Sequence, residues 1–248
     1  MYNILFLSVF NDGCMELAHN HLLSLQNAHI TNYIGYTTGY KSYIKLKSLK
    51  FNVIYNKTSY TNDKVLFDTK EFCNLSYLRY KIILGLLDKF DYIWYLDVDT
   101  FVKEGILTNI TKLLNKYDKV DILCQDDITM LCTGCMLIKN NNENKKTLKL
   151  ILDNQNNEIN DQILFNSLIN KKLIKSSILL LSKYEYINGL CYFDDIWLNI
   201  NENYKKYKQK YKKKSLAIKK NIYFIHANFI LGNDNKILAL KNKNLWLI

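Results

Sequence analysis

The chain has 248 residues, of which 48% are hydrophobic, so it can bury the core of one large domain or of two small ones. Its 34 Lys and Arg residues against 23 Asp and Glu residues give a formal net charge of +11. A basic balance is typical of proteins that bind nucleic acid, membrane surfaces or phosphorylated ligands. However, almost all of the excess is lysine, proline is absent and asparagine is abundant, which indicates a bias of the whole sequence. We therefore exclude net charge as a signal of function.

The amino terminus is an apolar run over residues 1–10 that has no basic segment and no cleavage site. It is also too short to span a bilayer. We predict that it forms the first buried strand of a soluble, cytoplasmic protein without a signal peptide, a membrane anchor or a membrane span.

Strand-like and helix-like patterns alternate along the rest of the chain. Strands are predicted at residues 1–10, 32–36, 52–55, 92–96, 120–124, 132–139, 177–181 and 222–225. Helices are predicted at about residues 15–26, 75–89, 106–117 and 144–154, with one more that opens at residues 160–166 and one near the carboxyl terminus. This alternation predicts an α/β protein with a single domain over residues 1–248. Helices should flank a central, mostly parallel sheet, and ligands should gather at one edge of it.

The six cysteines are scattered and lie mostly inside apolar runs, which predicts buried free thiols of a reducing compartment. Cys132 and Cys135 have the CxxC spacing of a zinc or redox site, but no second pair of cysteine or histidine residues answers them. Since apolar residues continue the pattern after Cys135, we interpret this motif as part of a strand.

Several charged side chains carry no signal of function beyond their residue type. Arg79 and Lys81 lie on a predicted helix and are predicted from residue type to be solvated. The lysine-rich segment 204–214 is predicted to be a solvated loop or helix, although a phosphate-rich surface could dock there.

Three histidines near the amino terminus, His19, His21 and His29, have neither the i, i+4 spacing of a ligand pair nor a carboxylate beside them. We predict that they are surface or capping residues.

Two carboxylates end the apolar run 92–96. Asp97 and Asp99 are two residues apart, so an extended chain would direct both side chains to the same side. Two acidic groups that face one spot need a positive partner, most simply a divalent metal ion. The alternative is an acidic turn after a strand, with no ligand.

A third candidate ligand stands at the end of another predicted strand. His226 follows the apolar run 222–225, and the carboxyl ends of parallel strands meet at one edge of a sheet. Two aspartates and one histidine suit Mn²⁺ or Mg²⁺ better than zinc. Gly232 would allow close approach of the backbone to a diphosphate, and Lys236 would supply a cation for it.

The order of these residues resembles a known family, the metal-dependent nucleotide-diphospho-sugar glycosyltransferases of the GT-A fold. The chain is similar to the group of glycogenin and the bacterial lipopolysaccharide galactosyltransferases. It is at least as similar to the nucleotide-diphospho-sugar transferases related to the plant rhamnogalacturonan xylosyltransferases. The resemblance extends over about residues 4–236 and is carried by Arg79, Leu96, Asp97, Val98, Asp99, Thr133, Gly134, Asp161, Gln162, His226, Gly232 and Lys236.

The resemblance implies a role for each of these residues. Asp97 and Asp99 would be the DxD pair, with Asp99 the more direct metal ligand and Asp97 also touching ribose, and His226 would complete the metal site. Lys236 would hold the diphosphate, and Arg79 would reach the donor sugar or phosphate.

On the sugar side, the resemblance places Asp161 and Gln162 beside the transferred sugar, with Gln162 nearest the anomeric carbon. Ser8, Asn11 and Asp12 would line the nucleoside pocket. The remaining residues implied in donor binding are Val98, Thr133, Gly134 and Gly232.

The implied reaction transfers a sugar from a nucleotide-sugar to a hydroxyl group of a glycan, a protein or a small molecule. The expected donor is a UDP-sugar. Retention of configuration is implied, by front-face attack of the acceptor with the leaving phosphate as base. Family members commonly carry Asn, which contacts the sugar, where this chain has Cys132. The resemblance therefore leaves the identity of the sugar open.

Two other classes of protein remain as alternatives. A phosphatase of the haloacid dehalogenase type also has a DxD after an apolar strand and binds Mg²⁺. It normally has Thr or Val two residues after the second Asp, near the amino terminus, whereas this chain has Phe101 in mid-chain. A nucleic-acid-binding protein would suit the charge, but the sequence contains no recognised nucleic-acid module, and its lysines are spread. We therefore expect no nucleic-acid partner.

Overall fold

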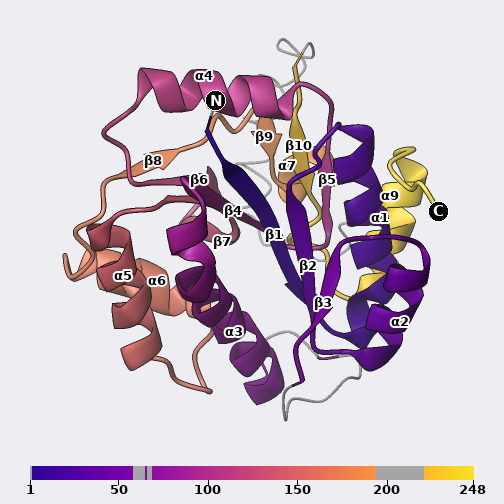
Figure 1. Cartoon of the computed structure of the whole chain (residues 1–248), viewed down its shortest axis with the longest axis horizontal. Coiled ribbons are helices and arrows are strands. Elements are labelled where there is room, and N and C mark those ends of the chain that lie inside the picture. The colour runs from indigo at the N-terminus through magenta and orange to yellow at the C-terminus, as the bar shows by residue number, and fades with distance from the viewer. Residues whose placement is uncertain (1, 58–64, 66–68, 194–220) are drawn as a thin grey trace.

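The computed structural model describes residues 2–57, 65, 69–193 and 221–248. These residues form a seven-stranded sheet with the order β3-β2-β1-β4-β7-β6-β8 and a smaller sheet with the order β5-β10-β9 (Figure 1). The predicted α/β class, with a central, mostly parallel sheet flanked by helices, is confirmed. The lysine-rich segment 204–214 lies outside the described residues.

The strands of the large sheet match the predicted apolar runs. They are β1 (Ile4–Phe10), β2 (Tyr33–Thr37), β3 (Val53–Tyr55), β4 (Tyr92–Leu96), β6 (Ile122–Asp126), β7 (Leu131–Lys139) and β8 (Ile178–Leu180). All neighbouring strands are parallel except β7, which is antiparallel to both β4 and β6. The short hairpin between β6 and β7 explains this exception, because parallel strands need a long crossover connection.

The small sheet was not predicted as a unit. It consists of β5 (Thr100–Val102), β9 (Tyr186–Ile187) and β10 (Phe224–His226). Only β10 had a strand signal, since β5 and β9 are too short to show a periodic pattern. These two strands exist because β10 pairs with both of them.

The helices and the short 3₁₀ turns are η1 (Asp12–Cys14), α1 (Met15–Asn27), α2 (Tyr40–Ser48), α3 (Lys70–Leu86), η2 (Leu87–Lys89), α4 (Ile106–Lys116), α5 (Asn142–Asp153), α6 (Asp161–Asn170), α7 (Gly189–Tyr192) and α9 (Asn233–Asn242). The sequence analysis missed α2 and α7. It also placed the start of α3 five residues too late. The helix begins at Lys70 because Thr69 caps it by accepting the N–H of Phe72. None of the helices among the described residues has the length and apolar character needed to cross a membrane.

The large sheet is buried on both faces, which explains why its strands are continuous apolar runs. In β4, Trp94 and Leu96 belong to the core that contains residues of α1, α4 and the small sheet. Ile93 and Tyr95 belong to the opposite core, formed with α3, α5 and α6, which lie together in Figure 1. Each fully buried large apolar side chain contributes about 2 kcal/mol of transfer free energy. The last residue of β4, Leu96, is therefore anchored in the core directly before the acidic turn.

Candidate active site

The acidic pair lies in the turn between β4 and β5 rather than in the strand itself. The Asp97 N–H donates to the carbonyl of Gly134 (2.8 Å). The Thr100 hydroxyl donates to the carbonyl of Asp97 (2.7 Å). These bonds attach the turn to β7 and to the start of β5, so the carboxylates extend from a fixed backbone.

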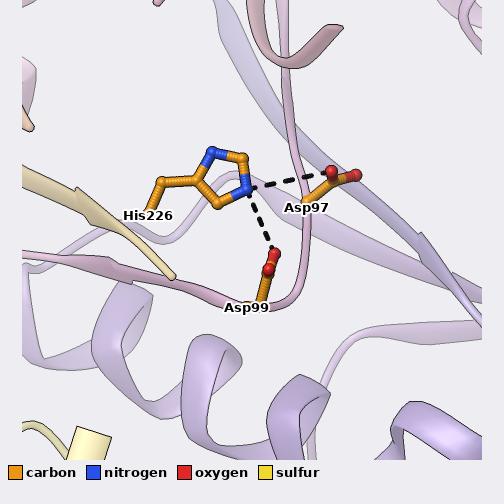
Figure 2. Close-up of side chains that lie close together, drawn as sticks. All are labelled: Asp97, Asp99 and His226. Carbon is orange, nitrogen blue, oxygen red and sulfur yellow. Dashed lines mark ion pairs between the residues drawn. The ribbon is translucent and has the colours of Figure 1, made fainter. Parts of the chain in front are cut away.

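His226 meets the two carboxylates from the small sheet. The antiparallel pairing of β10 with β5 sets His226 opposite Thr100, and the Ala227 N–H donates to the carbonyl of Asp99 (2.8 Å). Nε2 of His226 lies 3.2 Å from Oδ1 of Asp99 and 3.9 Å from Oδ2 of Asp97 (Figure 2). The predicted convergence of Asp97, Asp99 and His226 is thus present in the structure.

The geometry of this cluster fits a divalent cation. The three ligand atoms lie within 4.8 Å of one another. Ligands that surround an ion in an octahedron at about 2.1 Å are about 3 Å apart in neighbouring positions. Two carboxylate oxygens and an imidazole nitrogen are a suitable set for Mn²⁺ or Mg²⁺, and they leave further positions for water or phosphate oxygens.

The orientation of the His226 ring is determined by residues that the sequence analysis did not select. Nδ1 of His226 lies 2.9 Å from Oε1 of Gln125, and Nε2 of Gln125 donates to the carbonyl of Tyr186 (3.2 Å). Gln125 therefore accepts the proton of Nδ1, and Nε2 faces the carboxylates. Burial by itself lowers the pKa of His226, but the Asp99 carboxylate outweighs burial and raises the pKa above its usual value. A cation bound here would compete with a proton for this nitrogen.

Lys236 approaches the same cluster from the first turn of α9. Its Nζ lies 2.7 Å from Oδ2 of Asp99. Burial by itself raises the pKa of Asp99, but Lys236 and His226 outweigh burial, so the pKa of Asp99 lies well below its usual value. Gly232 precedes α9 with a positive φ of 82°, a conformation that favours glycine.

Arg79 is buried, with 6% of its surface exposed, so the prediction of a solvated side chain was wrong. Its Nη1 lies 3.4 Å from Oδ1 of Asp97 and donates to the carbonyl of Thr133 (3.0 Å), and its Nη2 lies 3.4 Å from Oδ1 of Asp161. Its guanidinium also stacks over the ring of Tyr95 at 4.6 Å. Lys81, on the same helix, is exposed as predicted. Arg79 therefore links the metal side of the site to Asp161.

Asp161 and Gln162 open α6 at the same edge of the sheet. The Asp161 carboxylate accepts the hydroxyl of Tyr80 (2.7 Å) as well as Nη2 of Arg79. Oε1 of Gln162 accepts the N–H of Thr133 (3.1 Å). The structure thus brings together Arg79, Asp161 and Gln162, the residues predicted to lie at the donor sugar, and links them through Thr133.

The three residues predicted for the nucleoside pocket lie at or just after the carboxyl end of β1, which is the neighbour of β4 in the sheet. Asn11 is 1% exposed. The Asp12 carboxylate accepts the N–H of Ser42 (2.7 Å) and thereby caps α2. The Ser8 hydroxyl lies 3.0 Å from Nε2 of His21. Their contact with a nucleoside stays a prediction.

His21 is fully buried, so the prediction of a surface position was wrong for this histidine. It belongs to α1, which packs on β5, and its Nδ1 lies 2.9 Å from the hydroxyl of Thr100. Because the Thr100 hydroxyl donates to the carbonyl of Asp97, His21 helps to hold the acidic turn in place through Thr100. Burial lowers the pKa of His21 from 6.5 to about 4. His29 is exposed, as predicted.

We expect the free energy of unfolding to depend less on pH, on the acidic side of neutrality, in His21→Gln than in the wild type. Between the unfolded pKa of 6.5 and the folded pKa of about 4, the unfolded chain binds the extra proton, so the free energy of unfolding rises with pH. His21 should contribute about 3 kcal/mol to this rise. Urea unfolding at several pH values should show a smaller rise in the variant, whereas the exposed His29→Gln should match the wild type. Identical slopes in all three proteins would contradict the burial of a neutral imidazole.

Gly134 lies against the side chains of Asp97 and His226. A Cβ atom at this position would lie 2.3 Å from Oδ2 of Asp97 and 2.7 Å from Cε1 of His226. We expect Gly134→Ala to separate these two ligands and to weaken Mn²⁺ binding by about 10- to 100-fold, as other changes beside metal ligands do. Titration with Mn²⁺, followed by its paramagnetic resonance signal, measures this loss. Gly85→Ala is the control, because a Cβ there meets nothing within 4 Å. Unchanged affinity in Gly134→Ala would exclude this position for the ion.

Solved glycosyltransferase structures share this fold. A glycosyltransferase involved in the glycosylation of the major capsid of PBCV-1 is 12% identical, with a TM-score of 0.57 over 99% of this chain and 100% of that one. The galactosyltransferase LgtC is 11% identical, with a TM-score of 0.57 over 96% and 95%. Mouse xyloside xylosyltransferase 1 is 13% identical, with a TM-score of 0.53 over 92% and 98%. The structure is therefore a GT-A glycosyltransferase fold.

Residues 28–240 match the nucleotide-diphospho-sugar transferase family, and the chain belongs to this family. It is a glycosyltransferase, and the phosphatase alternative is excluded as its class. Among curated protein sequences, none matches the chain.

Proposed function

We propose that this protein is a divalent-metal-dependent glycosyltransferase that moves a sugar from a UDP-sugar to a hydroxyl group of an acceptor. The observation that carries the proposal is the convergence of Asp97, Asp99 and His226 beside Lys236, at the edge of the sheet where Arg79 also lies. Three anionic or neutral ligands next to two cationic side chains suit an ion together with a diphosphate.

Asp97, Asp99 and His226 would hold Mn²⁺ or Mg²⁺. The bound cation would neutralise negative charge that develops on the leaving diphosphate. Lys236 would contact a phosphate oxygen while keeping its contact with Asp99, because its ammonium group has three donors. In this proposal the diphosphate would lie between β4 and α9, and the nucleoside would lie toward Ser8, Asn11 and Asp12.

The donor sugar would lie on the opposite side of the diphosphate, toward Arg79, Asp161 and Gln162. The Asp161 carboxylate is already bonded to Arg79 and Tyr80 and therefore is a poor nucleophile. For a reaction with retention, this favours front-face attack over a covalent intermediate on Asp161, with the acceptor hydroxyl giving its proton to the leaving phosphate. Cys132 stands where family members commonly carry Asn, so this position offers the sugar no amide. Its side chain is 3% exposed, with Sγ 3.8 Å from Nδ1 of His226.

The test is a thermal-shift and hydrolysis screen of nucleotide-sugars with Mn²⁺, with Mg²⁺ and with a chelator. A true donor at about 100 times its dissociation constant should stabilise the protein by about 2.7 kcal/mol. We expect this shift with a UDP-sugar and Mn²⁺, together with slow release of UDP, and expect both to disappear with the chelator. The proposal is wrong if no nucleotide-sugar stabilises the protein with any metal and Asp99→Ala changes nothing.

A further inference from the structure

A buried carboxylate that the proposed reaction does not use lies beside Gln162. Asp127 follows β6 directly and is 9% exposed. Its Oδ2 accepts Nε2 of Gln162 (2.8 Å), and its Oδ1 accepts Nδ2 of Asn228 (2.8 Å). One carboxylate thus connects the β6–β7 hairpin, α6 and the loop after His226.

Each of these two amides is also bonded at its other end. Oε1 of Gln162 accepts the N–H of Thr133 (3.1 Å), and Oδ1 of Asn228 accepts the N–H of Gly189 (2.7 Å). A backbone N–H can only donate and a carboxylate oxygen can only accept, so the two partners together decide which end of each amide faces where. The carbonyl oxygen of Gln162 is therefore directed to the side of Thr133, and its NH₂ group to Asp127.

We propose that Asp127 is a positioning residue that holds the NH₂ group of Gln162 away from the reacting sugar, so that the carbonyl oxygen faces the anomeric carbon. The inference rests on the proposed function. Positive charge develops on the anomeric carbon as the diphosphate leaves, and the negative end of a fixed carbonyl dipole stabilises it. A reversed amide would present N–H groups to the same carbon and oppose that charge.

Asp127→Asn tests this directly, because it replaces one accepting oxygen by an NH₂ group. That NH₂ group must face the NH₂ group of either Gln162 or Asn228. If Gln162 turns, its own NH₂ meets the N–H of Thr133; if Asn228 turns, its NH₂ meets the N–H of Gly189. Two donors then face each other in either case. Only one of the two ways of seating the new amide keeps the present orientation of Gln162, so Gln162 no longer has a single orientation.

The exchange variant Asp127→Asn/Asn228→Asp should restore the arrangement. The new amide at position 127 can accept from Gln162 with its oxygen and donate to the new carboxylate at position 228. That carboxylate can still accept the N–H of Gly189. The hydrogen bonds to Gln162 and from Gly189 keep their direction, only the bond between positions 127 and 228 reverses, and the negative charge moves to a different residue.

We expect Asp127→Asn to lower kcat by about 10- to 100-fold, the usual effect of changing a residue that orients a reacting group. The KM for the donor and the affinity for Mn²⁺ should change less than about 3-fold, and the exchange variant should regain kcat to within about 3-fold of the wild type. The control is Asp126→Asn in the same hairpin, whose carboxylate accepts the N–H of Ile128 (2.9 Å) and which should keep its kcat.

Two results would overturn the inference: wild-type kcat in Asp127→Asn, or an exchange variant as slow as Asp127→Asn. The second result would mean that the charge at position 127 matters, not the direction of the hydrogen bonds. If Asp127→Asn does not fold, the exchange variant alone decides, since it should be active without a carboxylate at position 127. A wild-type protein that binds no nucleotide-sugar would instead refute the proposed function.

Discussion

Under the proposed metal-dependent mechanism, Asp99→Asn is expected to lower kcat by about 100- to 1,000-fold, the range for removal of one group that stabilises the transition state. The amide lacks the negative charge that a cation needs. Its NH₂ group would also face either Nζ of Lys236 or Nε2 of His226, which lie 2.7 and 3.2 Å from the present carboxylate oxygens. Mn²⁺ titration and initial-rate measurements on the same preparation test both effects.

The same substitution should also destabilise the metal-free protein. Asp99 is 6% exposed, and removal of its charge leaves Lys236 without an ion-pair partner among the residues that the structure describes. Loss of one member of a buried ion pair destabilises by about 3 kcal/mol or more. The control is Asp88→Asn, which removes an exposed ion pair with Lys145 and should change stability by less than about 0.5 kcal/mol. Wild-type Mn²⁺ affinity in Asp99→Asn would remove this residue from the metal site.

Arg79→Met should be the most destabilising single change in the site. It leaves the buried Asp161 carboxylate with the hydroxyl of Tyr80 but with no cationic partner in the described part of the chain. We expect a loss of about 3–5 kcal/mol in the free energy of unfolding, measured by urea denaturation without metal. Lys81→Met on the exposed face of α3 is the matched control and should lie within about 0.5 kcal/mol of the wild type.

A second variant separates the structural role of Arg79 from its role in the reaction. Arg79→Met/Asp161→Asn removes both buried charges, so it should recover part of the lost stability. It should remain inactive, because the donor sugar would have lost two of its expected contacts. If Arg79→Met is as stable as Lys81→Met, the guanidinium is not a buried partner of Asp161.

The sequence predicts the layers of the fold well, because burial on both faces makes strands such as β1 and β4 continuous apolar runs. It does not predict β5 or β9, whose two or three residues carry no period of their own. It also misses α2, which has only two buried side chains, Ser42 and Leu46, and so lacks a broad apolar stripe.

For the site, the convergence of Asp97, Asp99 and His226 was predictable, whereas the residues that hold them in place were not. Asp97, Asp99 and His226 each follow an apolar run, and that pattern indicates the carboxyl edge of a sheet. Gln125 contacts His226, and His21 contacts Thr100. The two residues of each pair are far apart in the sequence, so only the order and register of the strands show that they meet. Asp127 had a partial signal, since it also follows a strand.

The pairing of β10 with β5 joins two parts of the chain that lie far apart in the sequence. His226 belongs to the carboxyl-terminal part of the sequence, whereas Asp97 and Asp99 lie before its midpoint. An ion held by all three would therefore be a reversible cross-link that closes a very long loop, and long loops gain most from closure. Resistance to proteolysis should then increase with cation concentration even without any sugar donor.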